Sequence, residues 1–210
     1  MNAPHTLAHL VPQGHAATPH EDAACGWPAW TQALQACFER HARTRMAGLP
    51  ICHPGLSVQA VGFMAWPPQG APEAQPRGWL GVLITPWFMN LVWRADADAP
   101  HTPAQQAEAQ HWLQLPVGTT RQLNVISASL PFIGTHEPEL GPFAVCSLMS
   151  PMFHLADQAA AVAAAQAVMD TLQQQAMAVL RERQVQAAQP QQPSRRGFLF
   201  GRGHAPATPP

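Results

Sequence analysis

The sequence contains no lysine and no tyrosine, and only 11% of its 210 residues are charged. All eleven residues counted as basic are arginines. Without lysine, the chain has neither a Schiff-base amine nor the lysine of a phosphate-binding loop. A formal net charge of −1 offers no basic surface to a polyanion. We therefore expect no nucleic-acid partner.

Cysteine is scarce, and its spacing matches no common metal or disulfide framework. Cys25, Cys37, Cys52 and Cys146 form no CxxC pair. Free thiols in a reducing compartment fit this pattern better than disulfides do.

Export and membrane signals are also missing. The N-terminus has no basic residue before Arg40, so it lacks the basic region that opens an export signal. The longest apolar run, residues 79–93, is too short for a membrane helix and is interrupted by Pro86. These absences predict a cytoplasmic protein without stable membrane insertion.

Composition divides the chain into three parts. Residues 1–26 carry four histidines among proline, alanine and threonine, and we expect a disordered leader there. Residues 27–185 are apolar enough for a single domain. Residues 186–210 are predicted to form a flexible tail that contains a twin-arginine-like motif.

Two stretches have helical periodicity. In residues 28–43 one face is formed by Trp30, Leu34, Phe38 (or Cys37) and His41, three or four positions apart, with Pro28 in the first turn. A longer helix is predicted to begin with Ser150 as N-cap and Pro151 as first residue, and to reach about Arg183. Residues 48–55 are rich in proline and glycine and are predicted to form a loop. Residues 95–111 are polar and contain proline, which is typical of a loop that could include a helical turn.

Between the two helices the pattern favours strands. Candidates are residues 56–66, 79–85, 88–93, 121–126 and 142–148, with turns around Gly134 and Gly141 between the last two. Strands and helices do not alternate, which argues against a doubly wound fold. We predict an α+β domain, a two-layer sandwich in which an antiparallel sheet is packed by an N-terminal and a long C-terminal helix.

The motifs of common enzymes are absent, so no catalytic residue is assigned. Cys146 and His154 could pair as nucleophile and base, but Cys146 lies in an apolar strand where thiols are usually inert. Cys52 and His53, with His41, could offer soft metal ligands, but no second Cys/His cluster supports them. We expect neither a metal nor a cofactor.

An unusual segment follows the most apolar strand. Thr85-Pro86-Trp87-Phe88-Met89-Asn90 places a proline, two large aromatics and a methionine where a central strand ends. These side chains could simply be core. Pro86, however, removes a donor from the sheet and forces an irregular turn. Trp and Met on such a rim are typical of adaptable binding surfaces.

Four sequence blocks resemble the HybE-type family of nickel–iron hydrogenase assembly chaperones. They are Gly81–Leu91, Leu115–Thr119, Cys146–Met152 and Arg195–Arg202, and the resemblance covers roughly residues 30–202. Some family members carry a rubredoxin-like domain, and this chain has no CxxC pair to form the iron site of such a domain. The predicted helix also runs on through residues 173–183, beyond its expected end in the family.

The resemblance implies a small α+β chaperone of a nickel–iron uptake hydrogenase. Such a protein binds immature subunits, either the small subunit with its twin-arginine signal or the large subunit, until their cofactors are in place. The candidate client-binding residues are Thr85, Pro86, Trp87, Phe88, Met89, Asn90, Ser150, Pro151 and Met152. A metal or redox carrier using Cys52 and His53 is the alternative function, and a maturation enzyme is a third.

The tail suggests a regulatory hypothesis. Arg195, Arg196, Phe198 and Leu199 resemble the core of a twin-arginine export signal at the wrong end of the chain. The tail is either merely flexible or occupies the groove that accepts the client's signal. Arginine pairs well with carboxylates. The predicted acidic rim for this contact consists of Asp96, Asp98, Glu108, Glu137 and Glu139.

Overall fold

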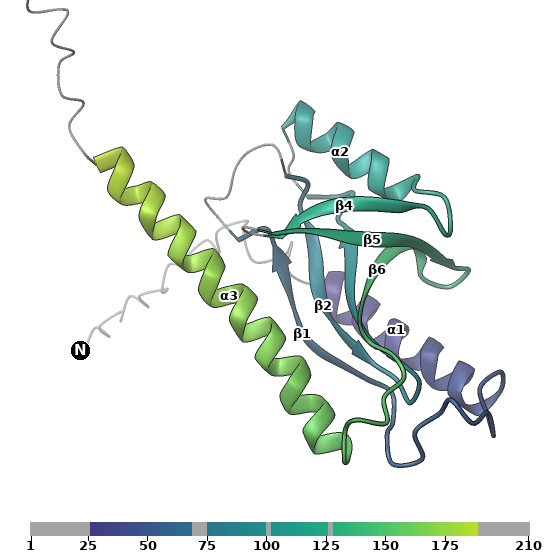
Figure 1. Cartoon of the computed structure of the whole chain (residues 1–210). Helices are drawn as coiled ribbons and strands as arrows, with labels where there is room; N and C mark the ends of the chain where they lie inside the picture. The colour runs from purple at the N-terminus through teal and green to yellow at the C-terminus, as the bar shows by residue number, and fades with distance from the viewer. Residues whose placement is uncertain (1–25, 69–74, 100–101, 126–127, 189–210) are drawn as a thin grey trace, which may run out of the picture.

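The computed structural model describes residues 26–68, 75–99, 102–125 and 128–188 and contains three helices and six strands in these ranges (Figure 1). Their order is α1 (Gly26–Arg43), β1 (Gln59–Trp66), β2 (Gly78–Ile84), β3 (Met89–Ala95), α2 (Pro103–Leu113), β4 (Thr120–Val125), β5 (Ala128–Glu137), β6 (Gly141–Met149) and α3 (Gln158–Ala188). The six strands form one antiparallel sheet in the order β1-β2-β3-β6-β5-β4. The predicted α+β class is therefore confirmed.

Strands β2 and β3 form the centre of the core. Leu80, Val82 and Ile84 pack on one face of β2, while Leu83 packs on the other. Burial on both faces explains the nearly continuous apolar sequence of these strands. The prediction of a central, covered strand at residues 79–85 is confirmed.

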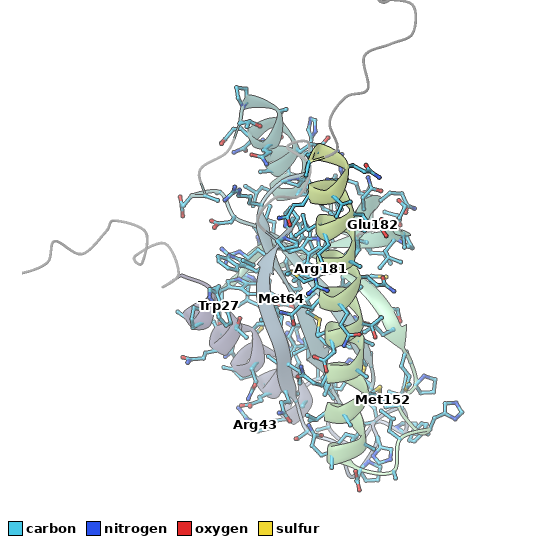
Figure 2. The ribbon with its side chains drawn as sticks, turned by 90° about the vertical axis from the view of Figure 1, so that its left-hand side faces the viewer. Trp27, Arg43, Met64, Met152, Arg181 and Glu182 are labelled. Carbon is cyan, nitrogen blue, oxygen red and sulfur yellow. The ribbon has the colours of Figure 1, made fainter. Side chains whose placement is uncertain are left out.

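Helices cover both faces of the sheet. Buried residues of α1 share a cluster with Leu83 and Val92, whereas those of α2 and α3 share the opposite cluster with Leu91 and Trp93. In Figure 2 the edge strand β1, which carries Met64, lies between α1 and α3. The N-terminal and long C-terminal helices thus pack the sheet as predicted, but on opposite faces, so there are three layers rather than two.

Among the described residues, no helix covers the β4 and β5 part of the sheet on the α1 side. On β4 and β5 the side chains that alternate with core residues are exposed, among them Gln122, Asn124, Ser129, Pro131 and Ile133. Most are polar, as expected for a solvated face of an antiparallel sheet. Within the described ranges, no helix is long and apolar enough to cross a membrane.

The long helix begins later than the sequence predicted. Ser150-Pro151 is a cis peptide bond in the segment before α3, so the prediction that Ser150 caps this helix is wrong. Asp157 has that role, since its carboxylate accepts a 2.8 Å hydrogen bond from the Ala160 amide. The helix then continues to Ala188, and Ala161, Ala165, Met169 and Ala176 are its buried residues.

Substitution of this cap gives a first prediction. Asp157→Ala should lower the free energy of unfolding by about 1 kcal/mol, because it leaves the Ala160 amide without its partner and removes a negative charge from a helix N-terminus. Asp170→Ala is the control, since Asp170 accepts only an exposed mid-helix bond from Gln166. Urea denaturation followed by circular dichroism measures both. Equal losses in the two variants would contradict the assignment of the cap.

Two further predictions are wrong. Most of residues 103–113 lie in the stretch 95–111 that was predicted as a loop with at most a helical turn, yet they form the helix α2. This helix opens with a capping box in which Thr102 and Gln105 exchange side-chain-to-backbone hydrogen bonds. Residues 128–137, predicted to contain a turn at Gly134, form the continuous strand β5. The backbone N–H and C=O of Gly134 bond to Thr119 and Gly118, which ties β5 to the loop before β4.

Candidate functional site

The segment after β2 is a tight turn held by one threonine. The Thr85 hydroxyl accepts hydrogen bonds from the amides of Trp87 and Phe88, at 3.3 and 2.9 Å. The Thr85 amide donates to the Phe88 carbonyl at 2.8 Å. Pro86 needs no donor in this turn, which is why proline is tolerated between two central strands. The turn therefore holds Trp87 and Phe88 at the end of the sheet.

Three other segments meet this turn. The His53 amide donates to the Pro86 carbonyl at 2.8 Å, and the Ser150 hydroxyl donates to the Trp87 carbonyl at 3.2 Å. Phe88 packs edge-on against Phe38 of α1, with ring centroids 5.9 Å apart. Figure 1 shows the loop after α1, the β2–β3 turn and the segment before α3 at the same, lower end of the molecule. Segments distant in sequence thus build one end of the domain.

Large apolar side chains are exposed at this end. Phe153 is 51% exposed, and its ring lies 5.9 Å from that of His53. Leu49 and Ile51, on the loop that contains His53, are each 43% exposed. Trp87 and Phe88 are half-buried and pack against each other edge to face. We call the group of Leu49, Ile51, Trp87, Phe88 and Phe153 the apolar corner.

Several of the residues predicted to bind a client lie below this surface. Thr85, Pro86, Met89, Asn90 and Met152 are buried, and Met89 and Met152 belong to the core. Met89 continues the face of β3 formed by Leu91 and Trp93, so strand alternation turns it inward. Their side chains shape the corner without reaching its surface. Trp87, Phe88, Ser150 and Pro151 remain accessible.

The sequence interpretation missed three members of the corner. Leu49 and Ile51 lie in the loop predicted at residues 48–55, and the predicted helix start at Ser150 would place Phe153 in a first helical turn. Phe153 follows directly after Ser150-Pro151-Met152, whose cis bond and late helix start leave it on an irregular segment. Large apolar residues in a proline- and glycine-rich loop, as in residues 48–55, were the available signal.

The predicted acidic rim is not one surface. Glu108 of α2 pairs with Arg121 at 2.6 Å, on the sheet face that carries α2. Glu137 and Glu139 pair with His41 and Arg40 of α1, on the opposite face. Asp96 and Asp98 lie after β3 and share a turn in which the Asp98 amide donates to the Asp96 carboxylate. The five carboxylates are thus divided among three places, and Arg195, Arg196, Phe198 and Leu199 of the tail lie outside the described residues.

The three cysteines of the described ranges, Cys37, Cys52 and Cys146, lie in different environments. Cys146 is buried and burial raises the pKa of its thiol, as expected for a core cysteine, while His154 is exposed. The Cys52 thiol donates to the Met46 carbonyl, and His53 Nδ1 accepts from the Gly55 amide. Cys52 and His53 thus stabilise their own loop. Another cysteine, Cys37, lies beside His41 instead.

This arrangement is typical of a binding domain, in which a rigid sheet supports an irregular apolar surface built by loops. Residues 29–201 match the family described as NiFe-hydrogenase assembly, chaperone, HybE. The chain belongs to this family.

Curated relatives agree with this assignment. Protein HoxT of Cupriavidus necator is 42% identical over 171 residues, which cover 80% of this chain and 87% of HoxT. The hydrogenase expression/formation protein HupJ of Bradyrhizobium diazoefficiens is 32% identical and covers 76% of this chain and 78% of HupJ. The solution structure of HybE from Escherichia coli aligns with a TM-score of 0.44 at 23% identity, over 84% of this chain and 91% of that one.

Proposed function

We propose that this chain binds immature subunits of a nickel–iron uptake hydrogenase in the cytoplasm, and holds them through its apolar corner until their cofactors are inserted. The proposed clients are the small-subunit precursor with its twin-arginine signal, the large subunit, or both. The chain acts by binding and catalyses no step. The observation that supports this proposal is an exposed apolar corner in a member of an assembly-chaperone family.

The physical argument starts from desolvation. Immature subunits expose apolar surface, and burying it against the corner is favourable by roughly 25 cal/mol per Å². Trp87 and Phe153 have large rings on irregular backbone, and such residues often dominate binding energies. The turn hydrogen bonds of Thr85 hold Trp87 in place before a client arrives, which reduces the entropy lost on binding.

The direct test is co-purification from cells that make the hydrogenase, with attached subunits identified by mass. The double variant Trp87→Ala/Phe153→Ala should retain little subunit, and its Kd for the purified subunit should rise about 30-fold or more, as expected for loss of hot-spot side chains. Both side chains are partly exposed, so the fold should persist.

The matched control removes exposed apolar groups elsewhere. Val117 lies between α2 and β4, and Val185 lies in the last turns of α3, at 70% and 59% exposure. Val117→Ala/Val185→Ala should capture the subunit as the unmodified chain does. Equal capture by the corner variant and this control would overturn the proposal.

A further inference from the structure

A second feature lies beside the apolar corner, where α1 meets the end of β5. Cys37 and His41 are one helical turn apart on α1, and Glu137 is the last residue of β5. The distance from Cys37 Sγ to His41 Nε2 is 3.6 Å, and that from His41 Nε2 to Glu137 Oε1 is 3.1 Å. All three ligand atoms lie within 4.8 Å of one another.

Both short contacts fall on the same histidine nitrogen. A catalytic Cys–His–acid arrangement uses both nitrogens of the ring, one toward the nucleophile and the other toward the acid. Here Nε2 faces both partners, so the three atoms surround a common point rather than form a relay. Convergence of a thiol, an imidazole and a carboxylate on one point is the arrangement of a metal site.

The spacing agrees with coordination geometry. Tetrahedral Zn²⁺ has bonds of about 2.3 Å to sulfur and about 2.0–2.1 Å to nitrogen and oxygen, which separates its ligand atoms by roughly 3.3–3.6 Å. The observed 3.6 and 3.1 Å differ from these separations by only a few tenths of an ångström, and the Cys37 sulfur lies within 4.8 Å of the Glu137 carboxylate oxygen. Three protein ligands leave one position for water or a partner's side chain, as in open zinc sites.

The charges of the three side chains and their access to solvent are also compatible with a bound metal ion. A bound dication would replace the thiol proton of Cys37 and balance one thiolate and one carboxylate. Cys37 is buried, whereas the side chains of His41 and Glu137 remain 16% and 19% exposed, which gives an ion a path from solvent.

We propose that Cys37, His41 and Glu137 form a binding site for a divalent transition-metal ion such as Zn²⁺, with one coordination position open. The Cys37 thiol releases its proton to solvent on binding, and His41 binds through Nε2 with its proton on Nδ1. The ion would link α1 to the β5–β6 hairpin directly behind the corner, since His41 packs on Phe38 and Phe38 on Phe88. The site is independent of any client.

Titration of the full chain with Co²⁺ tests this site. Thiolate-to-cobalt charge-transfer absorption should saturate at one equivalent, and Zn²⁺ should abolish it by competition. Cys37→Ser should remove this absorption, and Cys52→Ser should leave it unchanged. The histidines of residues 1–26 cannot produce the signal alone, because it requires a thiolate, and Cys25→Ser, which removes the thiol of that segment, should leave the absorption unchanged. Absence of the absorption, or its persistence in Cys37→Ser, would overturn the proposal.

Two variants keep the test decisive if Cys37→Ser fails to fold. Glu137→Gln and His41→Gln change partly exposed ligands. Each should weaken Co²⁺ binding at least about 10-fold, because a loss of metal affinity of this size follows even from mutation of residues that only hydrogen-bond to a metal ligand. Gln35→Ala, elsewhere on α1, is the control and should bind Co²⁺ normally. Unchanged affinity in both ligand variants would show that the cluster is only an ion pair beside a core thiol.

Discussion

Trp30→Ala is expected to lower the free energy of unfolding by about 3–5 kcal/mol, because it removes the main contact between α1 and the sheet. The Trp30 ring is buried and packs edge to face on Phe63 and Phe143, with centroids 6.2 and 5.8 Å away. Its indole N–H donates to the Leu140 carbonyl at 3.1 Å. The Arg94 guanidinium also lies over the ring, 4.9 Å from its centroid.

The contact with Arg94 should make the loss in unfolding free energy of Trp30→Ala larger than the loss of packing alone would. Burial lowers the pKa of the Arg94 guanidinium, while Asp96 and Asp98 oppose that shift. Removing the ring takes away a favourable cation–π partner of a half-buried charge. Trp30→Phe should recover part of the apolar contact but leave the Leu140 carbonyl without its donor, at a cost of about 1–3 kcal/mol.

A matched control lies one turn earlier in α1. Trp27 is only half-buried and stacks on Trp79, with ring centroids 6.0 Å apart. Trp27→Ala should therefore cost only about 1–2 kcal/mol. Guanidinium denaturation followed by circular dichroism gives all three values. If Trp30→Ala and Trp27→Ala lowered the free energy of unfolding by the same small amount, Trp30 would not be what holds α1 on the sheet.

The elements with dense apolar periodicity could be predicted from the sequence, because their burial shows directly in the pattern. In α1, the predicted face of Trp30, Leu34 and Phe38 is buried. Strands β2 and β3 alternate little because both faces are covered, and they too were located within one or two residues. The long helix was predicted by its periodicity but misplaced at its start.

Local signals failed where a distant contact decides the structure. The sequence predicts a turn at Gly134, yet this residue lies within β5 because the loop before β4 passes close by. A Cβ at this position would lie only 2.6 Å from the Pro116 carbonyl oxygen. Glycine in this strand is therefore required by close backbone approach rather than by a turn. No pattern within residues 128–137 carries that information.

Only part of the candidate site could be predicted from the sequence, because distant contacts decide the rest. The turn at Thr85–Phe88 is local, so its irregularity could be seen in the sequence. Which of its side chains face solvent depends on the segments that pack on it, namely residues 49–55 and 150–153. The group of Cys37, His41 and Glu137 depends on a contact across 96 residues between His41 and Glu137, and the sequence paired His41 with Cys52 and His53 instead.

Helix α2 was missed because it has little periodicity of its own. Within residues 103–111 its apolar positions are alanines, and the first large apolar residue is Trp112. The spacing of Thr102 and Gln105 was a usable signal, since Thr-x-x-Gln is the pattern of a capping box. An isolated helix of 11 residues is marginal in water, so α2 depends on its contact with the sheet.

Trp112→Ala should therefore remove most of what holds α2, at a cost of about 3–5 kcal/mol in the free energy of unfolding. The buried ring lies edge-on to Trp93 and Phe132, each with its centroid 6.3 Å away. Arg121 lies over the same ring and pairs with Glu108 of α2, so this ion pair should loosen as well. Denaturation measures the global loss, and hydrogen exchange of α2 amides measures local detachment.

His111→Ala is the matched control, because His111 neighbours Trp112 on the same helix but is exposed. It should change the unfolding free energy by less than about 0.5 kcal/mol and leave α2 amides protected. If Trp112→Ala were equally neutral, α2 would be held by its capping box and not by the sheet. The aromatic contacts of Trp112 with Trp93 and Phe132 make the opposite result the expected one, since they join α2 to two different strands.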